Sequence, residues 1–454
     1  MKGSNQMANY EKIIKVDIAV NTSASLREGF GIPLFITAHR EFSERVRIYT
    51  DLSGIAADFD TASNAYAAGQ SAFSQSPSVA QFYIGRREAD SVISIPVTPE
   101  AADSYTLSVT TATTTSVASY TATGGDTEEV VLQDLLNDLE AEIGSTGSAE
   151  VTLTLSGTGA GATLSIVDTD AEVSFHTAVS NDALLSIGLT STETPADIIN
   201  AVSTENDAYY FVTAEDHTDA FVTAMAMEIE ARKKVYFWST SDAAELSGSG
   251  TGLTLSMSEY DRSFGYFHHE AETRFPELAY VSFNAPWDAG SVTWANLQLS
   301  GIGASQSAGG NLLTATQKNN LTTANMNFSE TEAGLTFTRT GTCASGEWID
   351  TIRGVDWLDA EMTASLRDLL VNQAGGKITH DDVGYTQVKS VMDGVLQQAV
   401  QRNFLNSYTS SVPLAANVSF ADKASRILRD VTFVGNLSGA VHTIAVTGEV
   451  TYNS

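Results

Sequence analysis

The stretch that decides the fold begins at Gly341 as Gly-Thr-Cys-Ala-Ser-Gly-Glu-Trp-Ile-Asp350 and continues as Arg353-Gly-Val-Asp-Trp-Leu358. Two tryptophans, Trp348 and Trp357, stand among apolar neighbours, and large aromatic side chains commonly anchor a core. After this stretch the apolar residues take a helical spacing, and the chain then closes with an alternating segment. Residues 327–454 are therefore predicted to form one α+β domain with a strand left over at its end.

Two amphipathic helices are predicted directly after this stretch. The first begins at Asp359, a candidate N-cap, and ends at Gly375-Gly376, which favour a helix C-terminus. The second spans about 385–404 and carries its apolar residues at intervals of three and four positions. Together with the tryptophans, these stripes predict a C-terminal core made of Trp348, Ile349, Trp357, Leu366, Leu369, Val395 and Leu396.

Both ends of the chain show the alternation of a half-buried strand. Strands are expected at 424–434, 441–452 and 11–21. A strand at a terminus can pair with the sheet edge of a neighbouring copy, although an ordinary first strand of its own domain is the simpler interpretation of 11–21. The residues that share one face of these strands are Ile14, Val16, Ile18 and Val20 near the N-terminus, and Ile444, Val446, Val450 and Tyr452 near the C-terminus.

Charge and composition limit the classes of function. The 454 residues carry a formal net charge of −31, which excludes duplex nucleic acid as a direct partner, because that binding needs clustered Lys and Arg. No run of about 18 apolar residues predicts a membrane span, and no apolar signal region opens the chain, so we expect folding in the cytoplasm. Cys343 is the single cysteine, which excludes an intrachain disulfide and a Cys-rich zinc site.

Residues 25–96 and 195–326 alternate between buried strands and helices. Continuous apolar strands separated by helices are typical of a parallel sheet covered on both faces. We therefore expect a Rossmann-like, doubly wound α/β core built from two separate parts of the chain. The predicted strands lie at 29–37, 45–50, 79–85, 209–214, 235–240 and 280–284, and the predicted helices at 53–73, 196–202 and 218–231.

Residues 97–194 differ in composition from their surroundings. No Lys or Arg occurs between Arg87 and Arg232, whereas Asp and Glu are frequent there. A strand pair at 105–121, a helix capped by Thr127 and a hairpin across 157–161 are expected. The glycine-rich run of that hairpin lacks the Gly-Lys-Ser/Thr ending of a phosphate loop. We predict an acidic, β-rich domain inserted into the α/β core, on the outer surface of any assembly.

Three histidine clusters have the composition of a metal site: His217 with Asp216 and Asp219, His268-His269-Glu270, and His380-Asp381-Asp382. None has the His-Glu-x-x-His spacing of a zinc helix, and no Gly-x-Ser-x-Gly nucleophile motif occurs. Acidic residues before a helix are explained by its dipole. We therefore predict no catalytic, cofactor-binding or metal-binding residue, no cofactor and no enzymatic activity.

Several short motifs, taken in their order along the chain, resemble the contractile tail sheath proteins of myovirus-type bacteriophages, in particular a divergent branch of that family. The similarity covers about the first 90 residues and most of Asn327–Tyr452. The motifs are the N-terminal strand, Gly29-Phe-Gly-Ile-Pro33, the helix and strand of Ala65–Phe73 and Val79–Arg86, Ser345–Asp350, Asp356-Trp-Leu358, Asp382-Val-Gly384, Asp422–Arg426 and Ser438–His442.

The resemblance implies a structural function. Many copies would form a helical sleeve around a tail tube, with baseplate and tail terminator proteins as further partners, and contraction would drive the tube through the host envelope. An N-terminal arm, 1–24, and the last strand of the domain 327–454 would be exchanged between copies, and the helices of 359–404 would face the tube. The location would be the virion, after assembly in the host cytoplasm, without direct nucleic-acid contact or membrane insertion.

Other functions stay open at the level of the sequence. One is a different virion or surface-array subunit, such as a tube or decoration protein. A second is the sheath of a phage-tail-like bacteriocin, whose sequence would show the same patterns. A third is a hydrolase built on the α/β region, since catalytic groups can come from scattered positions.

Overall fold

The structure is a computed structural model that describes residues 29–42, 44–111, 114–144, 151–168, 175–181, 183–248, 252–371 and 376–445. The predicted N-terminal strand, with Ile14, Val16, Ile18 and Val20, lies outside the described residues, as do Val446, Val450 and Tyr452. The described residues form two compact units. The smaller unit comprises Ala360–Val395 and Thr409–Val434, and the larger unit comprises the rest.

An eight-stranded sheet forms the centre of the larger unit, in the order β17-β16-β13-β12-β11-β1-β3-β2. The strands from β16 to β3 pair in parallel, whereas the edge strands β17 and β2 run antiparallel to their neighbours. The inner strands are buried on both faces, as their continuous apolar runs predict. Their bounds are β1 Pro33–Ala38, β2 Val46–Tyr49, β3 Phe82–Arg87, β11 Phe211–Ala214, β12 Val235–Thr240, β13 Ser263–Phe267, β16 Asn327–Glu332 and β17 Leu335–Arg339.

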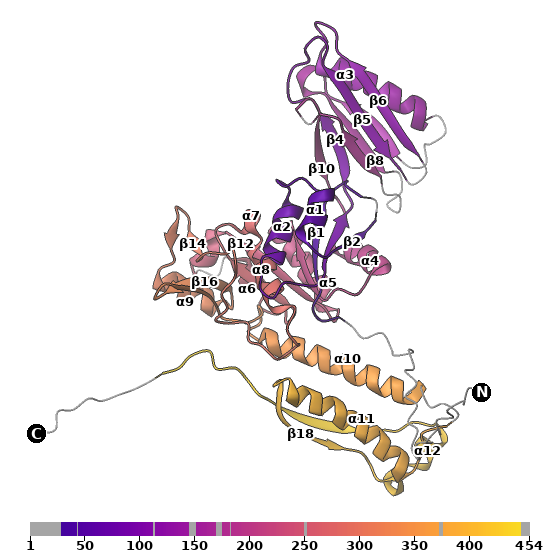
Figure 1. The fold of residues 1–454 in the computed structure, drawn as a ribbon, viewed down its shortest axis with the longest axis vertical. Helices are drawn as coiled ribbons and strands as arrows, with labels where there is room; N and C mark the ends of the chain where they lie inside the picture. The colour runs from indigo at the N-terminus through magenta and orange to yellow at the C-terminus, as the bar shows by residue number, and fades with distance from the viewer. Residues whose placement is uncertain are drawn as a thin grey trace, which may run out of the picture. The chain divides into compact units, whose positions relative to one another are not determined.

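Helices cover both faces of this sheet (Figure 1). Apolar residues of α4 and α5 fill one hydrophobic cluster, and those of α1, α2 and α8 fill the other. The mixed α/β, multidomain character is thereby confirmed, while the Rossmann-like assignment remains a prediction. The other elements of this region are α1 Leu52–Asp58, α2 Asn64–Phe73, α4 Pro195–Glu205, α5 Asp219–Glu230, η3 Ala243–Leu246, α6 Leu253–Ser256, α7 Ala271–Arg274, α8 Pro276–Asn284, α9 Ala315–Thr323, and the short strands β14 Gln306–Ser307 and β15 Asn311–Leu312.

Two predictions for the α/β region are wrong. The single helix expected at 53–73 is two helices, because the Ser63 side chain accepts the backbone N–H of Tyr66 and starts α2 anew. The strand expected at 280–284 is the second half of α8. Pro276 occupies its first turn, where the fixed φ of proline favours a helix, and the aromatic and β-branched residues that suggested a strand are buried against the sheet.

The inserted domain combines two antiparallel sheets with one long helix. Helix α3, Glu128–Leu139, begins where the Thr127 hydroxyl accepts the Val130 backbone N–H, as expected, and Figure 1 shows it lying on β5 and β6. Strand β4 already pairs with β10 and β8, so the small sheets begin at Asp90, before the predicted boundary at 97. The elements are β4 Asp90–Ser94, β5 Ser104–Thr110, β6 Thr115–Thr121, η1 Glu140–Gly144, β7 Val151–Ser156, η2 Gly159–Gly161, β8 Thr163–Asp168, β9 His176–Val179 and β10 Ser186–Thr190.

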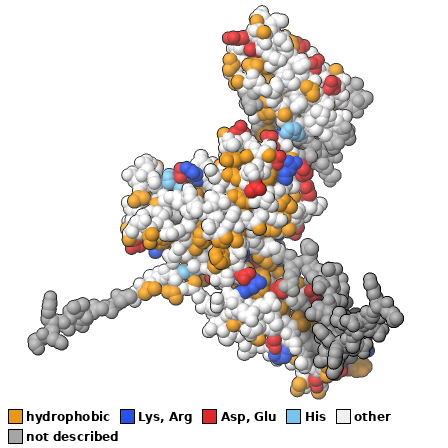
Figure 2. Space-filling model, in the orientation of Figure 1, with side chains coloured by type: hydrophobic (Ala, Val, Ile, Leu, Met, Phe, Trp, Pro, Cys, Tyr) orange, Lys and Arg blue, Asp and Glu red, His pale blue; other side chains and the backbone are white. Residues whose placement is uncertain are grey.

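Carboxylates without cations mark the surface of this domain. On the face drawn in Figure 2, its side chains include several red Asp and Glu groups and no blue Lys or Arg. This agrees with the sequence, which holds no Lys or Arg between Arg87 and Arg232. Like charges at this density repel one another, so two such domains would avoid close contact at low salt.

The C-terminal region differs from its prediction at both helix and strand boundaries. Helix α10 begins at Ile349, so Asp359 lies inside it and is not its N-cap. The strand expected at 424–434 begins only at Thr432, because Ala424 ends α12 and residues 425–431 lie in no strand; no described residue after Leu437 lies in a strand. The elements are α10 Ile349–Val371, α11 Asp382–Gln401, β18 Leu405–Ser411, η4 Ala415–Asn417, α12 Phe420–Ala424 and β19 Thr432–Leu437.

Candidate functional site

The carboxyl ends of β1 and β11 meet where the winding of the parallel sheet reverses. The chain passes from β1 to β3 on one side and returns to β11 on the other. In doubly wound folds this crevice is the usual place for a ligand. Here the Glu215 carboxylate lies in it and accepts hydrogen bonds from the Thr37 hydroxyl and, at 2.6 Å, from the Asn64 amide. The crevice therefore contains an internal hydrogen-bond network.

His217 follows β11 closely and lies in an ion-pair cluster in which its own side chain and Glu277 are buried and Glu272 is exposed. Its Nδ1 is 3.3 Å from the Glu272 carboxylate, and its Nε2 is 3.5 Å from the fully buried carboxylate of Glu277. Burial alone would lower the pKa of His217, but the two carboxylates outweigh burial and raise this pKa to about 10. The imidazolium is the charged partner that a buried Glu277 carboxylate needs, so the cluster is structural.

Replacing His217 with glutamine is expected to lower the free energy of unfolding most near pH 6.5 and least above pH 10. The folded-state pKa of about 10 lies above the ordinary value of 6.5, so the stabilisation is complete below 6.5 and is lost as the pH rises through 10. At about 1.4 kcal/mol per pKa unit, the shift from 6.5 to about 10 gives an expected difference of about 4–5 kcal/mol near pH 6.5. Urea denaturation of both proteins across this range measures it.

His268→Gln is the matched control for this experiment. Burial, together with the charge of His269, lowers the pKa of His268 to about 4, so its charge state is the same in the folded and unfolded chain above pH 7. The difference between H268Q and the parent should not change with pH in that range. If the H217Q difference is equally independent of pH, the proposed ion pair does not form.

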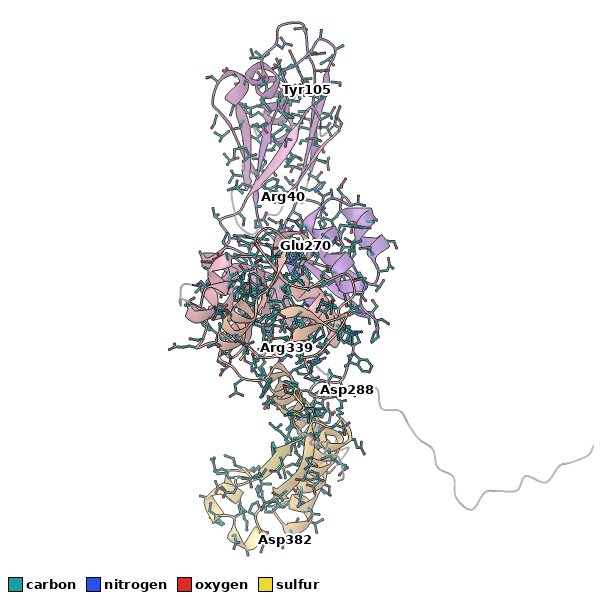
Figure 3. The ribbon with its side chains drawn as sticks, turned by 90° about the vertical axis from the view of Figure 1, so that its left-hand side faces the viewer. Arg40, Tyr105, Glu270, Asp288, Arg339 and Asp382 are labelled. Atoms are coloured by element: carbon teal, nitrogen blue, oxygen red, sulfur yellow. The ribbon has the colours of Figure 1, made fainter. Side chains whose placement is uncertain are left out.

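His268, His269 and Glu270 place three donor atoms within 4.8 Å of one another (Figure 3 labels Glu270). The Nδ1 of His268 already accepts the Glu270 backbone N–H at 3.1 Å, and its Nε2 faces the Gly303 carbonyl at 3.4 Å. Only His269 and the Glu270 carboxylate remain as ligands. Protein zinc sites use three or four ligands, so this group is not built as one.

A third cluster, His380-Asp381-Asp382, begins helix α11. The Asp381 carboxylate accepts the Gly384 backbone N–H at 2.8 Å, and the His380 Nδ1 lies 2.9 Å from the Tyr385 hydroxyl. Hydrogen bonds from Gly384 and Thr379 lower the pKa of Asp381. This is the geometry of a helix N-terminus, which is the structural role that the sequence predicts.

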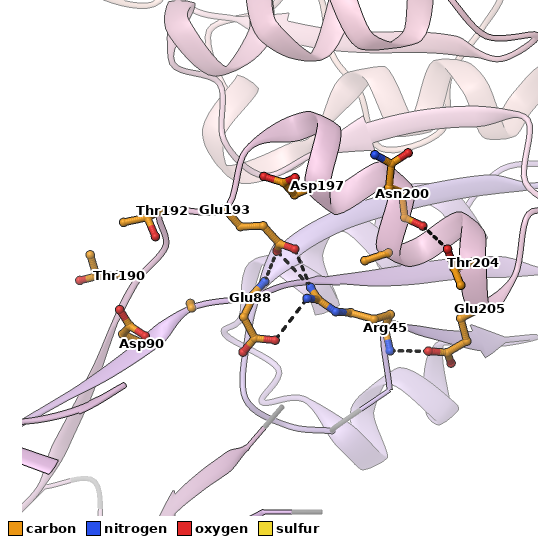
Figure 4. Close-up of a pocket in the computed structure, with 12 residues that line it drawn as sticks. Arg45, Glu88, Asp90, Thr190, Thr192, Glu193, Asp197, Asn200, Thr204 and Glu205 are labelled. Carbon is orange, nitrogen blue, oxygen red and sulfur yellow. Dashed lines mark hydrogen bonds and ion pairs between the residues drawn. The ribbon is translucent and has the colours of Figure 1, made fainter. Parts of the chain in front are cut away.

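The inserted domain joins the sheet through charged residues. Arg45 donates to Glu193 at 2.9 Å and lies 3.6 Å from Glu88, and its backbone N–H donates to Glu205 at 2.8 Å (Figure 4). These side chains line a cavity of about 730 Å³. Because Glu88 and Glu193 belong to the two segments that enter and leave the inserted domain, their pairing with one arginine fixes both connections.

Arg40, labelled in Figure 3, extends this junction into the core of the inserted domain. Its guanidinium pairs with Glu88, donates to the Phe175 carbonyl at 2.9 Å and lies 3.6 Å above the Phe175 ring. Both Arg40 and Phe175 are buried. Buried charges held by paired partners of this kind stabilise the junction.

Arg353, within the stretch that opens the C-terminal region, is 2% exposed and bonds to backbone carbonyls. It donates twice to Phe30, and once each to Asn284, Ala285 and Trp287, at 2.7–3.1 Å. Burial lowers its pKa to about 10. Gly31 must lack a side chain here, because a Cβ would lie 2.6 Å from the Ala285 oxygen. Arg353 and the Gly29–Pro33 motif lie far apart in the sequence, and no sequence pattern indicates that they are in contact.

Asp356 fixes the same stretch to the sheet from another side. Its carboxylate accepts a two-pronged pair of hydrogen bonds from Arg262, at 2.7 and 2.8 Å, and one from the Tyr210 hydroxyl at 2.7 Å. Next to it, the Arg402 guanidinium lies 4.2 Å from the Trp357 ring centre. The first turns of α10 are therefore part of the larger unit.

The predicted C-terminal core residues divide by burial. Trp348 is 44% exposed, so its assignment as a core anchor is wrong. It pairs with Thr342 in an isolated β-bridge just before α10, in a loop that leaves its ring at the surface. Ile444 is also exposed, at 81%. Ile349, Trp357, Val395 and Leu396 are buried, whereas Leu366 and Leu369 are half-buried.

Strands β18 and β19 form a two-stranded ribbon in the described part of the chain. Phe433, Val434 and Leu437 on β19 are 41%, 64% and 50% exposed. After Leu437 the chain continues as the C-terminal arm, defined here as residues 438–454. Exposed apolar residues on a narrow ribbon are the feature by which a sheet receives a further strand.

Known proteins match this chain in fold. No known protein family matches the sequence, and no curated protein does. A chain of the six-fold symmetrised anti-feeding prophage baseplate matches with a TM-score of 0.55 at 10% identity, over 97% of this chain and 100% of its own length. A chain of the contracted helical sheath of the anti-feeding prophage matches with a TM-score of 0.53 at 10% identity, over 97% and 99%.

This chain has a contractile tail sheath fold. The sheath fold confirms, at the level of architecture, the resemblance seen in the sequence motifs. Its neighbours are chains of sheath and baseplate assemblies. In the described ranges, no helix is both long and apolar enough to span a bilayer.

Proposed function

We propose that this chain is the structural subunit of a contractile tail sheath. Copies polymerise as a helical sleeve around a tail tube, and contraction of the sleeve drives the tube through the host envelope. The observation that carries the proposal is the match of 97% of the chain to a chain of a helical sheath in its contracted state. Because that match extends over both compact units, the proposal concerns the whole chain.

The ribbon of β18 and β19 supports pairing between copies. A two-stranded sheet needs a further strand or a covering helix for stability, and apolar residues on β19 are exposed. The arms at 11–21 and 441–452 alternate as edge strands do. A neighbouring copy that adds its arms would extend the ribbon through main-chain hydrogen bonds and cover Phe433 and Val434. The arms are thus exchanged, and copies stay tethered while they move.

Contraction, in this proposal, is a change of packing between copies. The subunits assemble in an extended, metastable lattice, and a signal from the baseplate releases them into a shorter and wider one. Such a step needs two alternative sets of interfaces and no cofactor. Tube, baseplate and terminator proteins are the partners, the helices of 359–404 face the tube, the inserted acidic domain lies outside, and the location is the virion.

The sheath of a phage-tail-like particle is the second candidate. It is favoured by the source of the matching chains, which are described as parts of an anti-feeding prophage. The arrangement of copies and the mechanism would be the same. The two candidates differ in the particle to which the tail belongs.

Electron microscopy of the purified full chain tests the proposal. At rising concentration, long hollow sleeves or stacked rings are expected, since sheath subunits carry their own interfaces. Particle length should increase with concentration, and light scattering should show a threshold. A monodisperse small oligomer at every concentration would contradict the proposal and favour a different virion protein.

A further inference from the structure

The C-terminal arm is held to the larger unit at His442. In residues 436–445, His442 is the one described residue that is not exposed; Val441 and Ile444, on either side, are 78% and 81% exposed. The arm would leave the subunit in any direction if nothing fixed it, because a chain of exposed residues has no packing to order it. The contacts of this single histidine therefore decide where the arm begins its path.

His442 is bound on two sides by residues that lie far from it in the sequence. Its ring meets the Trp348 ring edge-on, with 4.7 Å between ring centres. Its Nε2 lies 2.7 Å from the Thr293 hydroxyl, and the Asn296 amide donates to its carbonyl oxygen at 3.4 Å. One ring contact and two hydrogen bonds together fix both the side chain and the backbone of this position.

The residues that hold His442 are themselves rigidly supported. Thr293 precedes Trp294, which is 1% exposed and whose carbonyl accepts the Tyr280 hydroxyl at 2.7 Å. Trp348 precedes Ile349, which is 1% exposed. These supports belong to the larger unit, so His442 is held by a preformed socket, defined here as Thr293, Asn296 and Trp348.

A cavity of about 320 Å³ beside the socket is lined by Trp348, Asp350, Phe404, residues 437–440 and His442, among others. The Asp350 carboxyl faces this cavity, and burial raises its pKa. Leu437 leads into the socket from β19, where the Ser438 backbone N–H donates to the Phe404 carbonyl at 3.0 Å. The chain is thus held at Ser438 and again at His442, which leaves a short bridge over the cavity.

We propose that His442 and its socket form a pin that fixes the point and direction in which the C-terminal arm leaves one copy toward the next. The inference rests on the proposed exchange of arms, and its partner is a second copy of this chain. A pinned arm arrives at the neighbour's ribbon with less freedom to lose, so assembly begins at a lower concentration. The pin also explains why Trp348 is at the surface: its ring holds the arm.

The pin can be measured in the unassembled subunit. A nitroxide label is placed at Ile444→Cys, with Cys343→Ala to remove the buried native thiol, in dilute protein below the assembly threshold. The label should be restricted when His442 is present and at least twofold faster in H442A. Trp348→Ala should give the same mobility, and the double variant should add nothing, because both residues act through one contact. H442F retains the ring contact with Trp348, so the mobility of its label should lie between that of the parent and that of H442A.

Assembly is measured on the same variants without the label. H442A is expected to raise the threshold concentration for sleeves about tenfold, with no change in the thermal midpoint of the subunit. Equal label mobility with and without His442 would overturn the pin. So would faster mobility in H442A with an unchanged threshold, because the pin would then not serve assembly. A restricted label in a parent protein that never forms sleeves would overturn the proposed function and leave the pin as a feature of the fold.

Discussion

Replacing Arg353 with methionine is expected to lower the free energy of unfolding of the larger unit by about 3–5 kcal/mol. The guanidinium is 2% exposed and binds the carbonyls of Phe30, Asn284, Ala285 and Trp287. Methionine fills much of the same volume and donates no hydrogen bond, so these buried oxygens lose their partner. Each unsatisfied buried acceptor costs about 1–3 kcal/mol, with relaxation and entering water lowering the sum.

Fluorescence of the larger unit measures this loss. Trp238 and Trp294 are each 1% exposed, so their emission reports the unfolding of the unit that contains Arg353. Arg367→Met is the matched control: it lies on the same helix, α10, is exposed, and should change the unfolding free energy by less than about 0.5 kcal/mol. Arg353→Lys should lie between them, because one ammonium cannot reach all four carbonyls. Equal midpoints for R353M and R367M would show that the hydrogen bonds do not hold the unit.

Local signals explain the parts of the fold that the sequence predicts correctly. Continuous apolar runs such as Val235–Thr240 become strands buried on both faces, because a parallel sheet covered by helices has no solvent side. The N-cap at Thr127 places the start of α3 correctly, since the cap is a contact between neighbours in sequence. The parallel sheet and the acidic insertion follow from such signals added along the chain.

The wrong predictions arise where a local sequence pattern is compatible with two structures and contacts with distant residues determine which one forms. Residues 280–284 include strand-forming side chains, but they lie in helix α8, which Pro276 starts and which covers the sheet there. Asp359 looks like an N-cap, yet the apolar pattern of α10 runs back to Ile349, and Gly354 does not end the helix. Trp348 has the composition of a core anchor, but it pairs with Thr342 before α10, and its exposed ring contacts His442.

The contacts that position the C-terminal region could not be predicted from the sequence for a different reason. Arg353 reaches Phe30 across a separation of 323 residues, and its acceptors are carbonyl groups, which every residue has. No side-chain pattern marks a backbone acceptor. The same holds for His442 and Thr293, where one hydroxyl among many is the partner. Motif order along the chain indicated the sheath fold, whereas the contacts between the motifs required coordinates.

Deletion of residues 1–23 is expected to abolish sleeve formation and to leave the two units folded. The segment 11–21 alternates as an edge strand, and the ribbon of β18 and β19 has two strands, with apolar residues exposed on β19. If neighbouring copies complete that ribbon, a copy without its arm can bind one neighbour at most through the C-terminal arm. Sedimentation and electron microscopy measure the loss, and the thermal midpoint of the subunit should stay within about 2 °C of the parent.

Single substitutions in residues 11–21 test whether this segment pairs as a strand or whether assembly requires only an N-terminal segment of sufficient length. Ile18→Asp places a charge on the apolar face shared by Ile14, Val16 and Val20, and a buried unpaired carboxylate opposes the docking of that face. Asp17→Asn alters the opposite face and serves as the matched control. The threshold concentration for sleeves should rise more than tenfold in I18D and change less than twofold in D17N. Equal threshold concentrations for I18D and D17N, or sleeve formation by the chain that lacks residues 1–23, would mean that copies are joined by some other surface. Side chains of a paired strand alternate between its two faces, so substitutions on opposite faces should have different effects.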